Sequence, residues 1–375
     1  MKIICDDKIP FLKGALEPYA QVEYCAGAAI DASMVRDADV LVVRTRTRCD
    51  EALLSGSRVQ FVVTATIGYD HIDTAWCARH GVQWTNCPGC NAASVAQYIA
   101  SCLCALARKY SIDFTRTTVG VVGVGHVGSR VAAVASALGC RLLLCDPPRA
   151  RREGGASFVS LDDIMRESDI ITLHVPLSRE GEDATYHLFD EARMARLTPA
   201  QTLINSSRGE VVDNAALKEA LCRGALRTAI LDVWENEPRI DTALLEHLFA
   251  GTPHIAGYSQ DGKANGTTMS VQAIGQKYQL PCAHWQVTDV PAPLSPARLT
   301  LNAQGLSAQE IMMQAIEHTY RVSTDDARLR ASVSTFEAQR GAYPIRREFS
   351  AYTLHLVGAP PATLRSLQKI GFKVE

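Results

Sequence analysis

Thr118-Val119-Gly120-Val121-Val122-Gly123-Val124-Gly125-His126-Val127-Gly128 is the clearest indicator of the fold of this 375-residue chain. Its first five residues have the apolar pattern of a buried strand, and residues 131–138 have the apolar period of a helix. Glycines at the spacing G-x-G-x-x-G join these two elements. A strand, a glycine-rich turn and a helix in this order predict the first βα unit of an open parallel sheet.

The glycines of this turn indicate a nucleotide site. Gly123 permits a tight turn, Gly125 lets the backbone approach a pyrophosphate, and Gly128 allows the helix to pack closely. Unpaired N–H groups at the start of the helix attract the anion. We therefore predict a dinucleotide cofactor that contacts the whole turn, namely Gly123, Gly125, His126, Val127 and Gly128.

Asp146 follows the next apolar run, residues 141–145, near the spacing at which a carboxylate meets the ribose hydroxyls of NAD. This position favours NAD over NADP as the cofactor. Asp146 also precedes Pro147, and its structural alternative is to open an Asx turn. Three basic residues nearby could bind the extra phosphate of NADP, which keeps that cofactor as an alternative: Arg149, Arg151 and Arg152.

Short apolar runs alternate with helical patterns and predict an α/β fold with parallel sheets. A long helix is expected from an N-cap at Ser94 through Lys109, with an apolar face suited to packing between two domains. The runs that we interpret as strands are residues 40–43, 61–64, 118–122, 141–145, 170–175, 202–204 and 228–231.

Prolines after Tyr278 predict a linker, because proline does not continue a helix. A small third domain follows the linker. There Ser307 opens a capping box and a helix through Tyr320. We expect a strand at residues 351–357 and a last helix near residues 363–369.

The composition excludes several classes of partner. The chain has 38 Lys+Arg and 40 Asp+Glu, a formal net charge of -2 and no basic tail, so nucleic acid is not expected as a partner. The start lacks the apolar core of a signal peptide, and no run approaches the roughly 18 apolar residues of a membrane span. Twelve cysteines, mostly in apolar stretches, indicate a reducing compartment. We expect a cytoplasmic protein without membrane contact.

Cys87-Pro88-Gly89-Cys90 is a lone C-x-x-C motif, which occurs in zinc sites and in redox pairs. No second C-x-x-C or H-x-x-x-H supplies further metal ligands. We therefore interpret these cysteines as thiols of a loop and predict no metal site.

Three polar clusters each follow an apolar run, where parallel sheets place their ligands. Oxidation of a 2-hydroxy acid requires a clamp for the carboxylate, a base for the hydroxyl proton and a group that tunes the base. Arg208 offers a planar fork of donors for the carboxylate, His254 exchanges the proton, and Glu237 favours the imidazolium form of His254. Asp232 is expected to orient the carboxamide of the cofactor. The clusters predict hydride transfer between NAD and carbon 2 of a small 2-hydroxy acid.

Each of these residues has a structural alternative. Arg208 could be a surface charge, Glu237 could open a turn before a proline, and His254 could end a strand by bonding to the backbone. Their order after a dinucleotide turn favours the catalytic interpretation.

These motifs resemble the D-isomer-specific 2-hydroxyacid dehydrogenases over residues 1–280. The resemblance implies a Rossmann-type NAD domain, residues 94–257, inserted in a flavodoxin-like substrate domain of residues 1–93 and 258–280. The segments that carry the resemblance are the glycine turn and residues 66–73, 173–177, 204–213, 232–238 and 252–257.

Within this family the chain resembles members that oxidise a phosphorylated sugar acid, through residues 43–47, residues 257–267 and an extra C-terminal segment. The resemblance implies that residues 281–375 form a small α+β domain that mediates homodimer formation. It also implies NAD contacts at Asp146, His174, Ser206, Ser207, Asp232 and Gly257, and substrate contacts at Thr45, Thr66 and Tyr258.

The phosphate of such a substrate requires basic residues, and Arg44 and Arg46 lie in a suitable segment. Their alternative is that of surface charges at the end of a strand. Two other functions remain open: that of 3-phosphoglycerate dehydrogenase, and that of an NAD-sensing corepressor that binds protein partners. The presence of Arg208, Glu237 and His254 argues against a purely scaffolding role.

Overall fold

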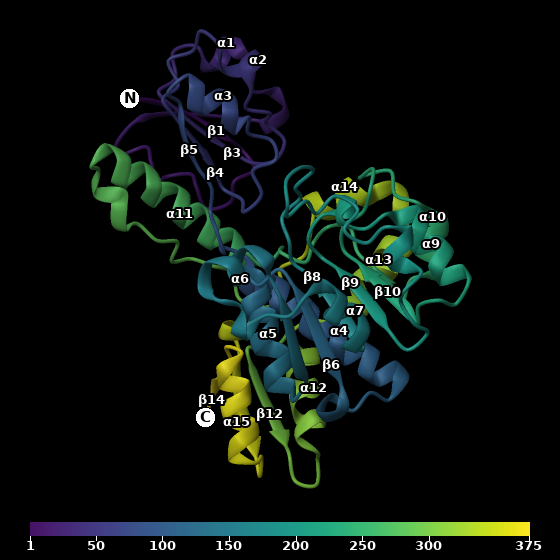
Figure 1. Ribbon diagram of the computed structural model, residues 1–375. Coiled ribbons are helices and arrows are strands. Elements are labelled where there is room, and N and C mark those ends of the chain that lie inside the picture. The colour runs from purple at the N-terminus through teal and green to yellow at the C-terminus, as the bar shows by residue number, and fades with distance from the viewer. The chain divides into compact units, whose positions relative to one another are not determined.

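The computed structural model describes residues 1–375 and separates into two compact units (Figure 1). Unit 1 comprises Met1–Asn91 and Ser259–Pro291, and unit 2 comprises Ala92–Tyr258 and Ala292–Glu375. The chain therefore leaves unit 1 to form most of unit 2 and returns to it before the C-terminal segment.

Unit 1 contains a five-stranded parallel sheet in the order β2-β1-β3-β4-β5, which is the flavodoxin-like order. Its central strands β3 and β4 are buried along their whole length, because helices cover both faces of the sheet. The strands are β1 (Lys2–Asp6), β2 (Gln21–Cys25), β3 (Val40–Val43), β4 (Phe61–Thr64) and β5 (Gln83–Thr85).

The two faces of this sheet have separate cores. Leu41, Val43 and alternate residues of the neighbouring strands pack against three short helices, α1 (Ala32–Val35), α2 (Glu51–Leu54) and α3 (Thr74–Arg79). Val40 and Val42 point to the other face and pack with Val271 and Ile274 of the long helix α11 (Gln260–Tyr278). This alternation is the period of two that a strand imposes on its side chains.

Unit 2 contains a six-stranded parallel sheet in the order β11-β10-β9-β8-β6-β7. The strand order reverses at β6, because β7 lies on one side of it and β8 on the other. Open α/β sheets bind ligands at such a switch point, beyond the carboxyl ends of the strands. The strands are β6 (Thr118–Val122), β7 (Arg141–Cys145), β8 (Ile170–Leu173), β9 (Thr202–Asn205), β10 (Thr228–Leu231) and β11 (Ala250–Gly251).

Helices again cover both faces of the sheet. The long helices α4 (Ala92–Tyr110) and α5 (His126–Leu138) share one core, while α7 (Leu161–Glu167), α9 (Asn214–Cys222) and α10 (Thr242–His247) belong to the other. The shorter helices α6 (Pro147–Glu153) and α8 (Glu191–Met194) complete the α/β layers. The predicted α/β class and the seven predicted strands are confirmed.

The predicted start of α4 differs from the observed one. The helix begins at Ala92, and Ser94 lies inside it rather than at its N-cap. Ser94 is fully buried, and its hydroxyl donates to Glu348 Oε1 at 2.8 Å. A residue more than 250 positions away thus decides the role of this serine, and local capping rules do not include such a partner.

The C-terminal segment forms a three-stranded parallel sheet, β12 (Arg298–Asn302), β13 (Thr353–Val357) and β14 (Lys373–Val374), with β13 in the centre. Its helices are α12 (Ala308–Thr319), α13 (Val322–Ala331), α14 (Phe336–Gly341) and α15 (Pro361–Lys369). Ser307 is the N-cap of α12 and accepts from Glu310 N at 3.1 Å. The second bond of the predicted capping box is not formed, because the Glu310 carboxylate accepts from Arg108 instead. Short 3-10 turns join the elements of the chain at Gly27–Ala29, Phe114–Arg116, Gly155–Ser157, Gly209–Val211, Pro281–His284, Val333–Thr335 and Phe349–Ala351.

This segment, expected to be a third domain, does not form a compact unit of its own. Ile311 and Ile316 of α12 and Leu354 of β13 belong to the same core as Tyr98 and Ile99 of α4. Figure 1 shows α15 beside α5, which it contacts. The C-terminal segment therefore covers the apolar faces of α4 and α5. This packing explains why the segment belongs to the same unit as the six-stranded sheet.

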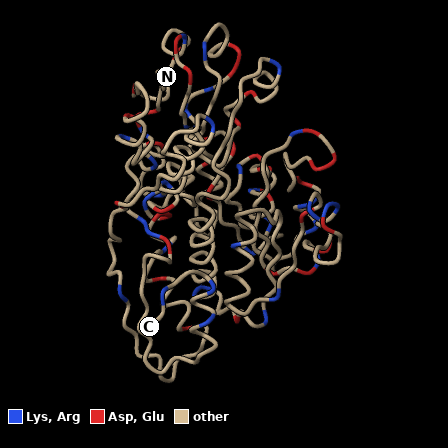
Figure 2. The backbone as a smooth tube through the Cα atoms, turned by 90° about the vertical axis from the view of Figure 1, so that its left-hand side faces the viewer, with Lys and Arg blue, Asp and Glu red and all other residues tan.

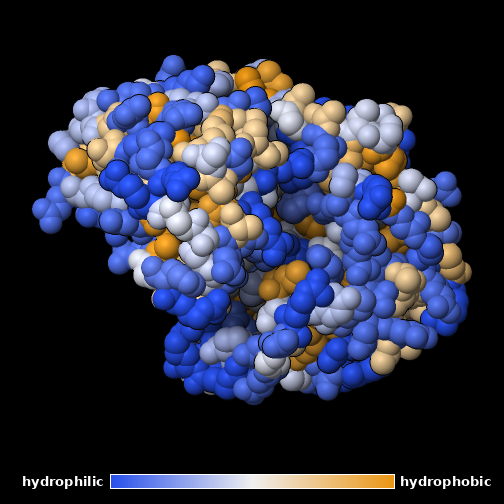
Figure 3. Space-filling model, turned by 90° about the horizontal axis from the view of Figure 1, so that it is seen from above, coloured by the Kyte–Doolittle hydropathy of each residue, from blue (hydrophilic) through white to orange (hydrophobic).

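The surface carries mixed charges. Figure 2 shows Lys and Arg interspersed with Asp and Glu along the chain, without a region of one sign. Figure 3 shows a mostly hydrophilic face with hydrophobic residues in small groups. None of the helices combines the length and the apolar character needed to cross a membrane.

The shared core predicts that the C-terminal segment stabilises the whole of unit 2. Ile316→Ala removes a fully buried side chain and should lower the free energy of unfolding by about 3 kcal/mol. Urea denaturation followed by circular dichroism measures the change. Arg130→Ala, at an exposed position of α5, is the control and should change stability little. Separate unfolding of the C-terminal segment, with the rest of unit 2 unaffected, would contradict the shared core.

Candidate active site

The glycine turn after β6 has the geometry that its sequence predicts. Gly123 has φ +83°, and a Cβ there would lie 2.5 Å from the carbonyl oxygen of His174. A Cβ on Gly128 would lie 1.9 Å from the carbonyl oxygen of Gly123, so only glycine permits this packing. A Cβ on Gly125 would have no neighbour within 4 Å. The turn therefore leaves open space beside Gly125, where α5 begins without a side-chain cap.

Uncapped N–H groups at the start of a 13-residue helix favour an anionic ligand. The open space at Gly125 and these donors together fit the pyrophosphate of a dinucleotide. His126 and Val127 are the first residues of α5 and lie next to this space.

Asp146 lies at the end of β7 and bonds to the glycine turn. Its Oδ2 accepts from Val124 N at 2.8 Å, and its Oδ1 accepts from Arg149 N at 3.0 Å as the N-cap of α6. Asp146 therefore does cap a helix, as its structural alternative requires. It also bonds to the glycine turn and so still lies at the nucleotide site. The nearby arginines have acidic partners: Arg149 and Arg152 pair with Glu153, and Arg151 pairs with Glu182 and Asp183. Their charges are compensated, which favours NAD over NADP.

Two enclosed polar atoms at the carboxyl ends of β8 and β9 have no partner within the chain. They are His174 Nδ1 and Ser206 Oγ. The other ring nitrogen of His174 lies 2.9 Å from Thr172 Oγ1, and Ser207 Oγ donates to Asn205 Oδ1 at 2.8 Å. Because a buried polar atom without a partner costs free energy, these two atoms indicate a bound ligand. Both belong to residues that we predict to contact NAD.

Burial lowers the pKa of His174 to about 3. The ring is therefore neutral at physiological pH, and one of its nitrogens is a hydrogen-bond acceptor.

Arg208 is held by its neighbours in the loop after β9. Its Nη1 donates to Ser207 O at 2.8 Å, and its own carbonyl accepts from Asn205 Nδ2 at 2.8 Å. A Cβ on Gly209 would lie 2.0 Å from the carbonyl group of Trp234. The turn that contains Arg208 and Gly209 therefore packs closely against the backbone of Trp234, in the segment that leads to Glu237.

Glu237 and His254 form the pair that the sequence predicts. Glu237 Oε2 lies 2.8 Å from His254 Nδ1, and Glu237 Oε1 accepts from Trp234 N at 3.0 Å. The side chains are 20% and 34% exposed, respectively. The second ring nitrogen of His254, Nε2, makes no hydrogen bond within the chain. His254 is thereby oriented by Glu237 and retains one nitrogen for a ligand.

Two opposing effects act on the pKa of Glu237. Burial acts to raise it, whereas the hydrogen bond and charge of His254 lower it, with further contributions from Trp234 N and Arg340. The net pKa is below the ordinary value, so Glu237 is ionised at neutral pH.

Asp232 follows β10 and is 1% exposed. Its Oδ1 accepts from Thr252 Oγ1 at 2.6 Å and from Ile255 N at 2.8 Å, and its Oδ2 accepts from Ala256 N at 2.9 Å. Burial raises the pKa of Asp232, opposed by these bonds and by the charge of His254. Its main structural effect is to fix the loop that carries His254, because His254 N also donates to Asp232 O at 2.7 Å.

The predicted substrate contacts of unit 1 lie at one edge of its sheet. Thr45 and the flanking Arg44 and Arg46 form a turn after β3, and Thr66 follows the neighbouring strand β4. Arg44 Nη1 donates to Lys8 O at 3.1 Å, and Thr66 Oγ1 donates to Gly68 O at 2.9 Å. Thr45 and Arg46 are exposed.

Tyr258 follows Gly257 at the end of the first segment of unit 2. Its ring meets that of Tyr343 edge to face, with centroids 5.9 Å apart, and the guanidinium of Arg340 lies 5.7 Å from its centre. Arg340 donates to Glu337 Oε1 at 3.0 Å, and its enclosed Nε has no partner.

The sequence did not indicate that Arg340, Tyr343 or Tyr98 adjoins this site. Tyr98 OH lies 2.8 Å from Thr252 Oγ1, which in turn bonds to Asp232. No spacing rule relates α4 or the C-terminal segment to the loops after β10 and β11. Only their packing in one core brings them together.

The cysteines of the C-x-x-C motif are both buried free thiols. Cys87 Sγ lies 3.4 Å from Thr64 O, 3.2 Å from Gly266 O and 3.4 Å from Ser270 Oγ. No group of three or more His, Cys, Asp or Glu side chains in residues 1–375 is arranged to hold a metal ion.

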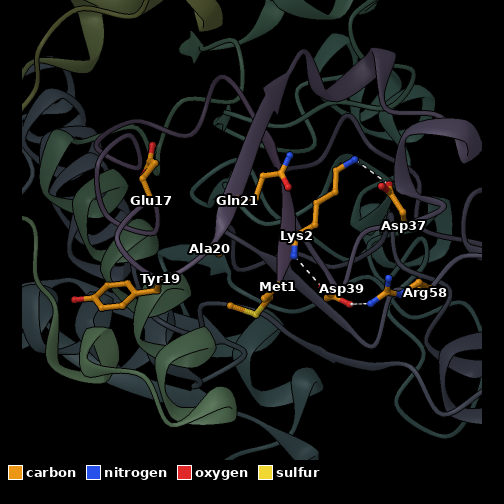
Figure 4. Close-up of a pocket in the computed structure, with 9 residues that line it drawn as sticks. All are labelled: Met1, Lys2, Glu17, Tyr19, Ala20, Gln21, Asp37, Asp39 and Arg58. Atoms are coloured by element: carbon orange, nitrogen blue, oxygen red, sulfur yellow. Dashed lines mark hydrogen bonds and ion pairs between the residues drawn. The ribbon is translucent and has the colours of Figure 1, made fainter.

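A cavity of about 600 Å³ in unit 1 is not at the candidate site. It lies at the amino ends of β1 and β2, away from the carboxyl ends that carry Thr45 and Thr66. Figure 4 shows Lys2 directed at Asp37 and Arg58 directed at Asp39. These charges satisfy one another, and we assign no function to this cavity.

Comparison with known proteins assigns the part of the chain that forms the six-stranded sheet of unit 2 to a described family. Residues 100–256 match the model of the D-isomer specific 2-hydroxyacid dehydrogenase, NAD binding domain. Residues 294–371 match a domain of unknown function, DUF3410.

Curated relatives match over nearly the whole chain. Erythronate-4-phosphate dehydrogenase of Bacteroides thetaiotaomicron is 47% identical over 94% of this chain and 99% of its own length. The protein of the same name from Porphyromonas gingivalis is 42% identical over 99% of this chain and 100% of its own length. Among solved structures, D-lactate dehydrogenase from Aquifex aeolicus, complexed with NAD and lactic acid, has a TM-score of 0.64 and 27% identity, and the match covers 74% of this chain and 96% of that one.

The low pKa of His174 predicts a pH dependence of stability. Below the ordinary histidine pKa of 6.5, the unfolded state binds a proton that the folded state excludes, so stability is lost as the pH falls. Between pH 7 and pH 5, the free energy of unfolding of the parent should fall by about 2 kcal/mol more than that of His174→Gln. Urea denaturation without cofactor measures both proteins. If the free energies of unfolding of the two proteins changed equally with pH, this would contradict a neutral His174 in the folded state.

Proposed function

Because the chain belongs to the erythronate-4-phosphate dehydrogenase family of D-isomer-specific 2-hydroxyacid dehydrogenases, we propose that it oxidises 4-phospho-D-erythronate. The product is 2-oxo-3-hydroxy-4-phosphobutanoate, the oxidant is NAD, and the step belongs to pyridoxal 5'-phosphate (vitamin B6) biosynthesis. The observation that carries the proposal is the 2.8 Å contact between Glu237 and His254, in the same unit as a glycine turn suited to NAD.

The cofactor site extends across the carboxyl ends of the unit 2 sheet. The turn Gly123–Gly128, including Gly125, His126 and Val127, holds the pyrophosphate through backbone N–H groups. Asp146 holds the adenosine ribose, and the unpartnered His174 Nδ1 and Ser206 Oγ gain partners on binding. The other contacts are Ser207, Asp232 and Gly257. A bound NAD would supply the hydride acceptor for carbon 2 of the substrate.

His254 is the base of the oxidation. Its Nε2 takes the proton of the hydroxyl on carbon 2, while Glu237 at Nδ1 stabilises the imidazolium that forms. In the reverse direction, His254 returns the proton to the carbonyl oxygen. Arg208 binds the carboxylate with two parallel N–H donors and thereby fixes carbon 2 for transfer.

The far end of the substrate carries the phosphate and requires cationic partners. We assign the phosphate to Arg44 and Arg46, and the remaining polar contacts to Thr45, Thr66 and Tyr258. Arg44 and Arg46 flank Thr45 in the turn that follows β3, at the carboxyl edge of the unit 1 sheet, which supports this assignment.

Two alternatives receive less support. A 3-phosphoglycerate dehydrogenase would act on a related acid, but the curated relatives named above match this chain through its C-terminal segment. A corepressor without turnover would have no need for the ordered Glu237 and His254 pair. We place the enzyme in the cytoplasm, because all twelve cysteines are free thiols.

The test of the function is turnover of a panel of acids with NAD. We expect 4-phospho-D-erythronate to be oxidised with the highest kcat/KM, followed at 340 nm, and 3-phosphoglycerate and D-lactate to be poor substrates. His254→Gln should reduce kcat by a factor of about 100 to 10,000, because the proton acceptor is lost. NADH binding by this variant, measured by fluorescence, is the control for folding. Turnover of 3-phosphoglycerate alone, or near-normal turnover by His254→Gln, would contradict the proposal.

We also propose that residues 281–375 mediate a homodimer. The segment carries exposed apolar side chains, since Leu294 is 72% and Val357 is 47% exposed. Exposed apolar residues near a small sheet are suited to an interface between copies of the chain.

Light scattering after gel filtration tests the dimer. We expect twice the chain mass of 40.7 kDa for the parent protein and a shift toward the single-chain mass for Leu294→Asp. Tyr186→Asp is the matched control, because Tyr186 is 41% exposed but lies outside the segment. A parent protein that stays monomeric at micromolar concentration would exclude this interface.

A further inference from the structure

Arg346 is a cation buried in the same core as the candidate site. It is 5% exposed, and it lies in the C-terminal segment, between α14 and β13. Its Nη2 donates to the carbonyl oxygens of Ile255 and Ala256, at 3.2 Å and 2.5 Å. These two residues directly follow His254. The guanidinium therefore bonds to the backbone of the loop that carries the proposed base, within its own chain.

The same loop bonds to Asp232 from its other side. Ile255 N donates to Asp232 Oδ1 at 2.8 Å, and Ala256 N donates to Asp232 Oδ2 at 2.9 Å. The carbonyl of Ile255 and the N–H of Ala256 belong to one peptide group. That group accepts from Arg346 and donates to Asp232, so it links a buried cation to a buried anion. Hydrogen bonds arranged in series in this way polarise and strengthen one another.

The charge of Arg346 is held in place by the C-terminal segment. Its guanidinium lies 4.6 Å from the ring centre of Tyr320 and 5.7 Å from that of Tyr343. Both tyrosine hydroxyls donate to Asp325 Oδ2, at 2.9 Å and 2.6 Å, and Asp325 is 4% exposed. The two aromatic rings therefore pack against the cation, and Asp325 orients both rings.

The loop requires such support because its backbone conformation is unfavourable. His254 has φ +55°, in the left-handed region that non-glycine residues seldom adopt. Surrounding contacts must hold such a residue in place. In this loop the contacts are the bond from His254 N to Asp232 O on one side and Arg346 on the other.

We propose that Arg346 is a positioning residue for the dehydrogenase reaction, which holds the Ile255–Ala256 peptide so that His254 and Asp232 keep their places. The C-terminal segment then contributes to turnover as well as to association. This inference rests on the proposed function, because the loop matters for catalysis only if His254 is the base.

Three variants test the role. Arg346→Met keeps much of the length of the side chain and removes its charge, and Arg346→Lys keeps a charge but replaces the planar guanidinium by a single ammonium group. Arg330→Met is the matched control, because Arg330 of α13 also donates to two backbone carbonyls, of Leu245 and Leu248, at 2.8 Å and 3.0 Å. Those carbonyls lie at the end of α10, away from the His254 loop. The measurements are kcat and KM for 4-phospho-D-erythronate, NADH affinity by fluorescence, and the midpoint of thermal unfolding.

We expect Arg346→Met to lower kcat about 30-fold or more and to weaken NADH binding several-fold, while its unfolding midpoint falls no further than that of Arg330→Met. Arg346→Lys should recover part of the lost kcat, because it restores a donor and a charge. Equal kcat and NADH affinity in Arg346→Met and Arg330→Met would overturn the proposal. If Arg346→Met does not fold, Arg346→Lys decides: parental kcat in that variant would also overturn it. A parent protein without turnover would instead refute the proposed function.

Discussion

The buried carboxylate of Asp232 is the constraint on which the candidate site depends. A carboxylate that is 1% exposed must be compensated, and here three donors from one loop, Thr252 Oγ1, Ile255 N and Ala256 N, do so. The loop is thereby wrapped around the end of β10, and its histidine is held in the left-handed region at φ +55°. The place of His254 beside Glu237 follows from this arrangement.

The sheets explain why these residues meet at all. The strands of unit 2 run parallel, so the loops after β6, β8, β9 and β10 leave from one edge. The order reverses at β6, which opens the crevice that the glycine turn requires. Gly209 lets the Arg208 turn press against the carbonyl of Trp234, and a side chain at this position would separate the two loops.

The C-terminal segment belongs to the same compact unit as the candidate catalytic residues. The sequence predicts a separate small domain with a role in association. In the structure its helices complete the core of α4 and α5, and its residues Arg340, Tyr343 and Arg346 come within reach of Tyr258 and the His254 loop. The matches to the two curated relatives cover 94% and 99% of this chain.

Local sequence patterns were enough to predict the α/β class, the seven strands, the glycine turn and the Glu237–His254 pair, because each depends on local periodicity or on residues that follow strand ends. They did not determine that Ser94 lies inside α4 with Glu348 as its partner, or that Arg346 lies behind the His254 loop. Those contacts join residues 90 to 254 positions apart. Only the tertiary structure decides them, because the packing of two cores brings together side chains that no local rule relates.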